Sequence, residues 1–382
     1  MRVYMDLLKY GAARRLIAAT ATGKLGFAIF PLATVLLGHD SSGSFLDAGA
    51  VAGAWSMGGT ATGPLRGHLV DRYGHRVPLA ALALLTAVAA TGLATASGTT
   101  QLICFGALAG AAAPPIVASI RPLWTQAVSR DLVHSAYALD AVLTEVTKIC
   151  GPLLAAAAAT YSPQLGLVAA AALLVTGTCL VVLHPPADRP SAPSGTGWDV
   201  LASPALRLLC ATNACAGLCL GALTVALPAR AAERGSTADA GWMFACLAVG
   251  SALAGTAMGA HHRSTAPITG YLTAFVWLAL ALTPLTIASA SPLLVVLLIS
   301  AGAAFAPMTI CLFELMDAHA PRHTAVAAMM WMVAAEELGI AAGTVTAGAT
   351  AQHAGAWLAL FTAAVGGGLG ALVVVTYRAR LQ

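Results

Sequence analysis

The sequence predicts an all-α polytopic membrane protein in which twelve transmembrane helices form two pseudo-symmetric six-helix bundles. Hydrophobic residues make up 59% of the chain and charged residues only 9%, whereas roughly a quarter of the residues of a soluble domain are charged. The apolar residues form long unbroken runs and do not alternate at every second position, so the spans are helices and not strands of a barrel. In addition, the second half of the chain repeats the pattern of the first.

Polar breaks divide the apolar runs into twelve segments, each of which is long enough to cross a bilayer as a helix of about twenty residues. The expected spans are 16–37, 45–66, 77–97, 101–125, 134–159, 164–184, 204–228, 239–260, 266–289, 292–317, 322–350 and 355–377. Between the sixth and seventh spans the chain is rich in Pro, Ser and Gly, which is typical of a linker. We therefore expect a first bundle in residues 1–184, a cytoplasmic linker in 185–203 and a second bundle in 204–382.

The distribution of Arg and Lys predicts the orientation of the helices. If the N-terminus is cytoplasmic, only Arg230 and Arg234 lie in an outside segment. The inside segments then contain Arg2, Lys9, Arg14, Arg15, Arg66, Arg72, Arg76, Arg130, Arg189, Arg207, Arg263, Arg322, Arg378 and Arg380. Cytoplasmic segments of membrane proteins carry such an excess of basic residues. We expect both termini in the cytoplasm, which requires an even number of spans.

The two halves of the chain resemble each other at a separation of 192 residues. The segment AGAAAPPIVASIRPLW (109–124) aligns without gaps on AGAAFAPMTICLFELM (301–316). The same separation places Gly63 on Gly255 and Gly67 on Gly259. Two parallel six-helix repeats are an architecture of secondary transporters.

Other classes of protein are disfavoured by the sequence. The eight Cys are scattered, nearly all in apolar runs without metal-site spacing, so we expect them, the Cys215/Cys219 pair included, to act as packing residues. The net charge of +4 is small and dispersed, which disfavours nucleic-acid binding. No Gly-x-Ser-x-Gly, P-loop or His-Glu-x-x-His motif is present. We therefore expect no enzyme activity, no cofactor and no metal.

Charge is concentrated in residues 67–76, GHLVDRYGHR, between the second and third spans. The spaced residues are Gly63, Gly67, Asp71, Arg72, Gly74 and Arg76. Their pattern and place resemble the signature loop of the major facilitator superfamily, which lies between the second and third helices of its members. An excess of positive charge at the cytoplasmic surface would explain the Arg residues, but not Asp71 or the spaced glycines.

A physical role can be given to the residues of this loop. Gly63 and Gly67 would let another helix approach closely, and Gly74 would permit a tight turn. Asp71 is suited to an exposed helix N-terminus or to a nearby Arg. The resemblance implies that the loop is a latch, which holds the two halves together in one state and releases them in the other. His75 replaces a further basic residue of the family pattern, which predicts a weaker latch.

Charged residues inside the spans are candidates for function, because a bilayer accommodates them only at a cost. They are Lys24, Arg121, Asp140, Glu145, Lys148, Glu314, Glu336 and Glu337. Spans three, six, nine and twelve contain none, which fits the outer position against lipid that the resemblance implies for them. The remaining helices would line a central cavity, with aromatic surface from Trp55, Trp331, Phe27, Phe30, Tyr137 and Phe313.

Two pairs of these charged residues stand out. Glu145 and Lys148 are three residues apart, so they share a helix face and can pair; the pair either only neutralises itself or takes part in coupling. Glu336 and Glu337 point about 100° apart, so at least one faces the cavity or the other half, where loss of hydration favours its protonated form. We expect one of them to carry a proton or to help bind a cationic substrate. Glu336 is favoured, because it matches Glu145 at a separation of 191.

The resemblance implies two further features. The fourth helix of family members often carries an Arg linked to proton coupling, and Arg121 occupies roughly that place; alternatively its side chain extends to the cytoplasmic surface. Gly151 and Pro152 resemble part of the antiporter motif, in which a Gly-Pro pair bends the fifth helix. The other glycines of that motif are absent here.

These observations predict a secondary transporter that works by alternating access. In the absence of a P-loop an ion gradient would supply the energy for transport. The protonatable carboxylates in the spans favour the proton as the coupling ion. We expect efflux of a small amphipathic organic compound; the alternatives are a proton symporter for a sugar or small organic acid, and a non-transporting sensor with the same fold. Sixteen Arg against three Lys, with abundant Ala, suggest a GC-rich bacterial gene and hence the bacterial inner membrane. The resemblance implies a monomer in the bilayer.

Overall fold

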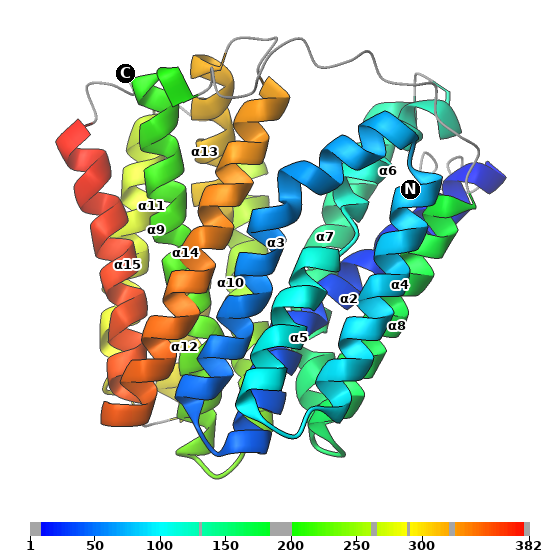
Figure 1. Cartoon of the computed structure of the whole chain (residues 1–382). Coiled ribbons are helices and arrows are strands. Elements are labelled where there is room, and N and C mark those ends of the chain that lie inside the picture. Colours follow the sequence, from blue (N-terminus) through cyan, green and yellow to red (C-terminus); the bar gives the residue numbers. More distant parts are fainter. Residues whose placement is uncertain are drawn as a thin grey trace.

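The computed structural model describes residues 9–129, 132–183, 201–260, 266–288, 291–320 and 325–377, and their regular structure is entirely helical. The expected linker 185–203 lies almost wholly outside the described residues. Figure 1 shows the helices running up and down side by side, with both ends of the chain on the same side of the molecule. We call that side the terminal face and the other side the opposite face.

The helices follow the expected order of spans. In the first half they are α2 (Gly11–Ser42), α3 (Phe45–Tyr73), α4 (Arg76–Thr95), α5 (Thr99–Ala112), α6 (Ile116–Ala127), α7 (Val133–Ala159) and α8 (Pro163–Val182). In the second half they are α9 (Pro204–Ala232), the 3₁₀ turn η3 (Thr237–Asp239), α10 (Ala240–Ala260), α11 (Pro267–Leu285), α12 (Ser291–Gly302), α13 (Phe305–His319), α14 (Ala325–Ala354) and α15 (Ala356–Tyr377). Among the described residues nine helices are long and apolar enough to cross a bilayer, and Thr99–Ala112 and Val146–Ala159 are shorter apolar helices.

Short polar residues begin several of these helices. The hydroxyl of Ser44 accepts a hydrogen bond from the backbone N–H of Asp47 (3.3 Å) and so caps α3. Ser162 and Ser203 cap α8 and α9 in the same way, through the N–H groups of Leu165 and Leu206. Such caps satisfy N–H groups that the first turn of a helix leaves without a partner.

The fourth span, expected as one helix, is broken into two, whereas the tenth contains only a short turn within Pro292–His319, which by length and composition can cross a bilayer as one span. The fourth consists of α5 and α6, and the tenth of α12 and α13. Pro114 and Pro115 have no N–H to donate, so the helix ends before them. In the tenth span the break precedes α13, whose third residue is Pro307. Both breaks fall in or beside the segments that match in the internal repeat.

Helix packing confirms the internal repeat at a separation of 192 residues. Gly110 of α5 lies against the carbonyl of Trp55 in α3, so that a Cβ added at Gly110 would collide with it. Gly302 of α12 lies in the same way against the carbonyl of Leu247 in α10. Each residue of the second contact follows its counterpart by 192 positions. Glycines at these positions therefore let the second and fourth spans, and the eighth and tenth, pack backbone against backbone.

A substitution at Gly110 tests this close approach. Gly110→Ala is expected to lower the stability by about 1–3 kcal/mol, because the extra methyl group overpacks a backbone contact. The measurement is the apparent Tm in detergent. Gly368→Ala is the matched control: nothing lies within 4 Å of a Cβ built there, and Ala favours a helix over Gly. An equal loss of Tm in the two variants would contradict this account.

The helices of the two halves meet through a limited set of pairs. The largest such interface joins α3 and α14, and further contacts join α7 with α10 and α2 with α9. In the described residues α4, α8, α11 and α15 pack substantially only on helices of their own half. These four helices are spans three, six, nine and twelve, and they present apolar side chains outward, such as Leu84, Leu280 and Leu372, each at least 60% exposed. Their outer position is thereby confirmed.

The closest approach of the two halves lies toward the opposite face. Gly49 of α3 and Gly348 of α14 touch each other's helix backbones, and Gly241 of α10 lies against α7 near Ala156. The backbone N–H of Phe45 donates a hydrogen bond to Oε1 of Gln352 (3.0 Å) at this end. The first turns of α3 and the last turns of α14 therefore hold the halves together away from the termini.

Candidate functional site

The segment that carries the expected latch is mostly helix. Helix α3 continues to Tyr73, so residues 67–73 form its last two turns and not a loop, contrary to the expectation. The turn itself is Gly74, with a φ of 76°, a conformation that Gly adopts easily. Arg76 then begins α4. The tight turn expected at Gly74 is present, and the part of Gly74 in a latch stays a prediction.

The expected role of Gly63 and Gly67 is not seen in this conformation. Nothing lies within 4 Å of a Cβ built at Gly67, and at Gly63 only the Arg66 side chain of the same helix does. The physical reason is that the two halves meet toward the opposite face, whereas Gly67 lies near the terminal face.

The charged residues of the latch are only partly described. Arg72 is exposed, and its guanidinium lies over the ring of Tyr73, 5.5 Å from the centroid. The side chain of Asp71 lies outside the described part of the structure. Its backbone is in the last turn of α3, and its expected partner, an exposed helix N-terminus or a nearby Arg, stays a prediction.

A buried ion pair joins the first and fifth spans. Nζ of Lys24 in α2 lies 2.9 Å from Oδ1 of Asp140 in α7 and donates a hydrogen bond to the hydroxyl of Thr144 (2.6 Å). The side chains of Lys24 and Asp140 are 7% and 18% exposed. Because desolvation of the two charges offsets much of their attraction, such a pair adds little net stability, but breaking it is costly. Lys24 is therefore held by Asp140 in this conformation.

Loss of one partner of this pair is expected to do more harm than loss of both. Lys24→Met alone leaves the carboxylate of Asp140 buried without a cation, which costs about 3–5 kcal/mol. Lys24→Met combined with Asp140→Leu removes both charges and should recover most of the stability. The measurement is the apparent Tm of the two single variants and of the double variant in detergent. If the loss of Tm in the double variant equals the sum of the losses in the two single variants, the pair does not act as a unit.

Two adjacent carboxylates of the second half lie beside cations of the first. Glu337 of α14 interacts with the hydroxyl of Ser56 and with the charge of Arg66, both in α3. Glu336 interacts with the charge of Lys148 in α7 and with the side chain of Asn213 in α9. Both carboxylates lie near the middle of the 30-residue helix α14. The arrangement places two acids at the interface of the halves, each within the electrostatic range of one cation of the first half.

Arg66, expected at the cytoplasmic end of the second span, has a side chain that does not extend toward the terminal face. It lies within α3, and its guanidinium extends back along the helix to the carbonyl of Gly59 (2.5 Å). The same guanidinium also donates to the carbonyl of Ala113. The polar partners are inside the bundle, so the long side chain of Arg66 turns away from the terminal surface.

Two close-packed glycines lie at matching places on α7 and α14. Gly151 of α7 packs against Ala28 of α2, and Gly343 of α14 packs against α9 at Leu218. The two glycines are 192 residues apart, but the residues that they touch are 190 apart, so the register of the repeat is not fixed to one residue on these helices. A separation of 192 places Glu145 on Glu337 and a separation of 191 places it on Glu336, so the equivalence of Glu336 and Glu145 stays a prediction.

The remaining predicted residues are placed as follows. Gly151 and Pro152 lie in the uninterrupted helix α7, where Gly151 permits close packing on α2. Lys148 and Glu314 are exposed and each has an interaction partner. The side chains of Glu145, Arg121 and Tyr137 lie outside the described part of the structure, so the pairing of Glu145 with Lys148 stays a prediction.

Aromatic side chains gather between α2 and α3. The rings of Phe30 and Trp55 stack with their centroids 3.9 Å apart, and Phe27 lies 6.0 Å from Trp55. Phe30 and Trp55 are buried, whereas Phe27 is 45% exposed. Trp55 is next to Ser56, the partner of Glu337. Phe27 is thus the accessible ring of this aromatic cluster.

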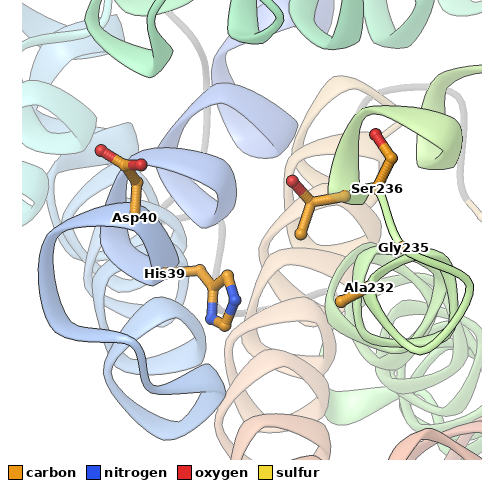
Figure 2. A pocket seen from close by; sticks show the side chains of 6 residues that line it. His39, Asp40, Ala232, Gly235 and Ser236 are labelled. Atoms are coloured by element: carbon orange, nitrogen blue, oxygen red, sulfur yellow. The ribbon is translucent and has the colours of Figure 1, made fainter.

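A shallow polar pocket lies between the halves, at the ends of the first and seventh spans. It is lined by His39 and Asp40 of α2 and by Ala232, Gly235, Ser236 and Thr237 at the end of α9 and in η3. Figure 2 shows His39 pointing from α2 toward the side that carries Ala232. The His39 ring also stacks on Phe45, with centroids 3.9 Å apart. The pocket lies toward the opposite face, where the two halves approach most closely. None of the predicted site residues lines it.

Sequence reasoning missed four polar residues of the site. Asp140 was noted in its span but not paired with Lys24, and the parts played by Ser56, Arg66 and Asn213 were not foreseen. One signal was available for the first: a lone Lys in an apolar span needs an acid on a neighbouring helix. In the described residues no cluster of three or more His, Cys, Asp or Glu side chains could hold a metal.

Comparison with known proteins agrees with this architecture. The family model of the Major Facilitator Superfamily matches residues 16–344. Among solved structures, the nucleoside transporter NupG is 12% identical, with a TM-score of 0.79 over 97% of this chain and 99% of that one. A bacterial homologue of the human lysosomal transporter Spinster, inward-facing and occupied, is 14% identical, with a TM-score of 0.71 over 94% and 95%. The human organic anion transporter MFSD10 is 18% identical, with a TM-score of 0.64 over 94% and 98%. Comparison with the curated proteins finds no match.

Proposed function

The chain belongs to the major facilitator superfamily, and from this premise we propose that it is a secondary active transporter that exports a small amphipathic organic compound in exchange for protons. The halves would rock about a site between them, as in alternating access. The protein would work as a monomer in the bacterial inner membrane, with both termini in the cytoplasm. Its partners would be the substrate and protons, and it would need no cofactor.

The observation that carries this proposal is the position of Glu336 and Glu337 between the halves. Each carboxylate lies near a cation of the other half, Lys148 or Arg66. When the halves move apart at this level, the carboxylates lose these cations in a medium of low dielectric constant. A carboxylate that loses its cation there becomes more stable when it takes up a proton. Proton uptake would thereby be linked to the change of access.

The substrate class follows from the surroundings of these acids. The exposed face of Phe27 beside Trp55 offers apolar contact, while Ser56, Asn213 and the carboxylates offer polar contacts. A compound with one apolar and one polar part can use both kinds of surface. The Gly151-Pro152 pair favours antiport over symport.

The test uses everted membrane vesicles with a pH-sensitive dye in the lumen. Ethidium, a nucleoside, a sugar and a small organic acid are added in turn, as probes of an aromatic cation and of the alternative substrates. Antiport predicts that an accepted compound makes the lumen more alkaline, because protons leave as the compound enters. Symport would acidify the lumen instead. No proton movement with any compound, in vesicles that contain folded protein, would contradict transport and favour a sensor.

A further inference from the structure

The break in the fourth span removes backbone hydrogen bonds inside the bundle. Pro114 and Pro115 have no N–H, and the N–H of Ile116 is donated to the carbonyl of Pro114 (2.8 Å). The carbonyls at the end of α5 therefore need other donors, because a polar group without a partner is costly inside a membrane protein.

Three side chains supply these donors to three consecutive carbonyls. The hydroxyl of Thr62 lies 2.9 Å from the carbonyl of Ala111 and 2.9 Å from that of Gly58 in its own helix. The hydroxyl of Thr86 lies 3.1 Å from the carbonyl of Ala112 and 2.9 Å from that of Leu82. Each hydroxyl thus shares its one proton between the break and its own helix. The guanidinium of Arg66 donates to Ala113. Thr62 and Arg66 come from α3, and Thr86 comes from α4, so the break is held by the two neighbouring spans of its own half. Arg66 is the only one of the three donors that carries a charge.

Arg66 is also linked to the other half. Its charge acts on Glu337 of α14, and α3 and α14 form the largest interface between the halves. Both terminal nitrogens of the guanidinium are engaged, by the carbonyls of Gly59 and Ala113, while the buried Nε has no hydrogen-bond partner in the described residues. A carboxylate is a stronger acceptor for a guanidinium than a carbonyl is. Arg66 thus has two competing sets of partners, the broken helix and Glu337.

We propose that Arg66 is a positioning residue that transmits the charge state of Glu337 to the break in the fourth span. Ionised Glu337 draws the guanidinium toward α14, which brings the halves together on the terminal face and takes a donor from Ala113. Protonated Glu337 leaves Arg66 on the carbonyls of Gly59 and Ala113, as seen here, and the halves stay apart on that face. This inference rests on the proposed proton coupling at Glu337 and adds the element that responds to it.

Several charged and polar groups lie around Glu337. Glu336 is its neighbour, α3 supplies Ser56 and Arg66, and Lys148 of α7 acts on Glu336. Of the other helices packed on α14, α9 supplies the uncharged Asn213 and α13 carries the exposed Glu314. Helix α15 has no Asp, Glu, Lys or Arg within Ala356–Tyr377. The charged groups near Glu337 are thus Glu336, Arg66 and Lys148.

The second half lacks this arrangement. At a separation of 192 residues Thr62, Arg66 and Thr86 correspond to Ala254, Met258 and Leu278. None of these side chains carries a hydroxyl or a guanidinium group. The charge-sensitive break is therefore a property of the first half alone, and the fourth span is expected to respond to Glu337 while the tenth is not.

The experiment measures the distance between the halves on the terminal face without any substrate. Spin labels are attached at Val77→Cys and Ala318→Cys, both exposed near that face, in a variant whose native cysteines are Ala. Electron–electron distances are recorded in lipid nanodiscs at low and high pH. We expect the parent protein to shift toward shorter distances at high pH, Glu337→Gln to keep the long distance at both, and Arg66→Gln to lose the pH response. Arg66→Lys keeps the charge and should retain part of the response.

The control variants distinguish an electrostatic link between Arg66 and Glu337 from mere structural support of the broken fourth span. Thr62→Val and Thr86→Val each remove one bond to the break without changing charge, so the pH response should persist in both. A normal response in Arg66→Gln would overturn the proposal, as would the absence of any response in the parent protein. Equal effects of Arg66→Gln and Thr86→Val would reduce Arg66 to a structural residue. Because no substrate is used, failure here is distinct from failure of the vesicle assay.

Discussion

Glu337→Gln is expected to abolish proton-driven accumulation of substrate while substrate exchange persists. Gln resembles the protonated carboxyl group in shape and carries no charge, so the site stays in the state that the proton normally creates. Exchange needs only the movement of loaded carrier, whereas accumulation needs the proton to bind and leave. In proteoliposomes with an imposed pH gradient, uptake of a substrate identified in the vesicle assay should fall to near the level of empty liposomes. Counterflow of the same compound should persist, at a lower rate than in the parent protein, because the variant favours the state in which the halves stay apart on the terminal face.

Glu336→Gln is the matched control, one residue away on the same helix. Glu336 interacts with Asn213 of its own half and not with Arg66, which is linked to Glu337, so we expect a smaller loss of accumulation there. If Glu337→Gln accumulates substrate normally and Glu336→Gln does not, the assignment of the proton to Glu337 is wrong. If neither variant loses accumulation, the proton is carried elsewhere, and Glu145 and Arg121 become the candidates.

The general architecture could be predicted because it follows from simple constraints. A chain with 9% charged residues has to be solvated largely by lipid, and span length then determines the number of helices. The repeat was visible in the segments 109–124 and 301–316, and the contacts of Gly110 and Gly302 reproduce it in space. The outer position of four helices was implied by the family resemblance, and their lack of charge fits it, because only helices shielded from lipid can carry charge at little cost.

The polar contacts of the site could not be predicted, because they depend on how each helix is rotated about its axis. Lys24 and Asp140 are 116 residues apart in the chain, and the lone Lys of the first span indicates only that some neighbouring helix supplies an acid, not that Asp140 does. Arg66 seemed to belong to the cytoplasmic surface by its position in the sequence. Its guanidinium turns inward because the break at Pro114 and Pro115 leaves carbonyls that need donors. The break was itself missed, since an apolar run shows no gap where two prolines interrupt the helix.

The second large effect is expected at Asp71, where loss of a charge should impair transport without harming the fold. Asp71 lies in the last turn of α3, where a negative charge is unfavourable to its own helix by about 0.3–1 kcal/mol. The acid is therefore not there to stabilise α3. Its pattern with Gly67, Arg72 and Gly74 resembles a latch, whose partner would come within reach only when the halves close on the terminal face.

Asp71→Asn should therefore leave the amount of folded protein in the membrane and its apparent Tm unchanged or slightly raised, while the initial rate of transport falls strongly. Asp71→Glu keeps the charge and should restore part of the rate. Asp47→Asn is the control on the same helix: it lies in the first turn of α3, at the opposite face, where its carboxylate accepts a bond from Thr99 (3.1 Å). It should transport normally. A normal rate of transport in Asp71→Asn would contradict the latch and leave the spaced glycines and the acid with no role beyond ending α3. If Asp71→Asn lowers both the rate and the Tm, the substitution impairs folding and the latch is not tested by the loss of rate. The dipole of α3 predicts no such loss of Tm, because a negative charge at the C-terminal end of a helix is unfavourable.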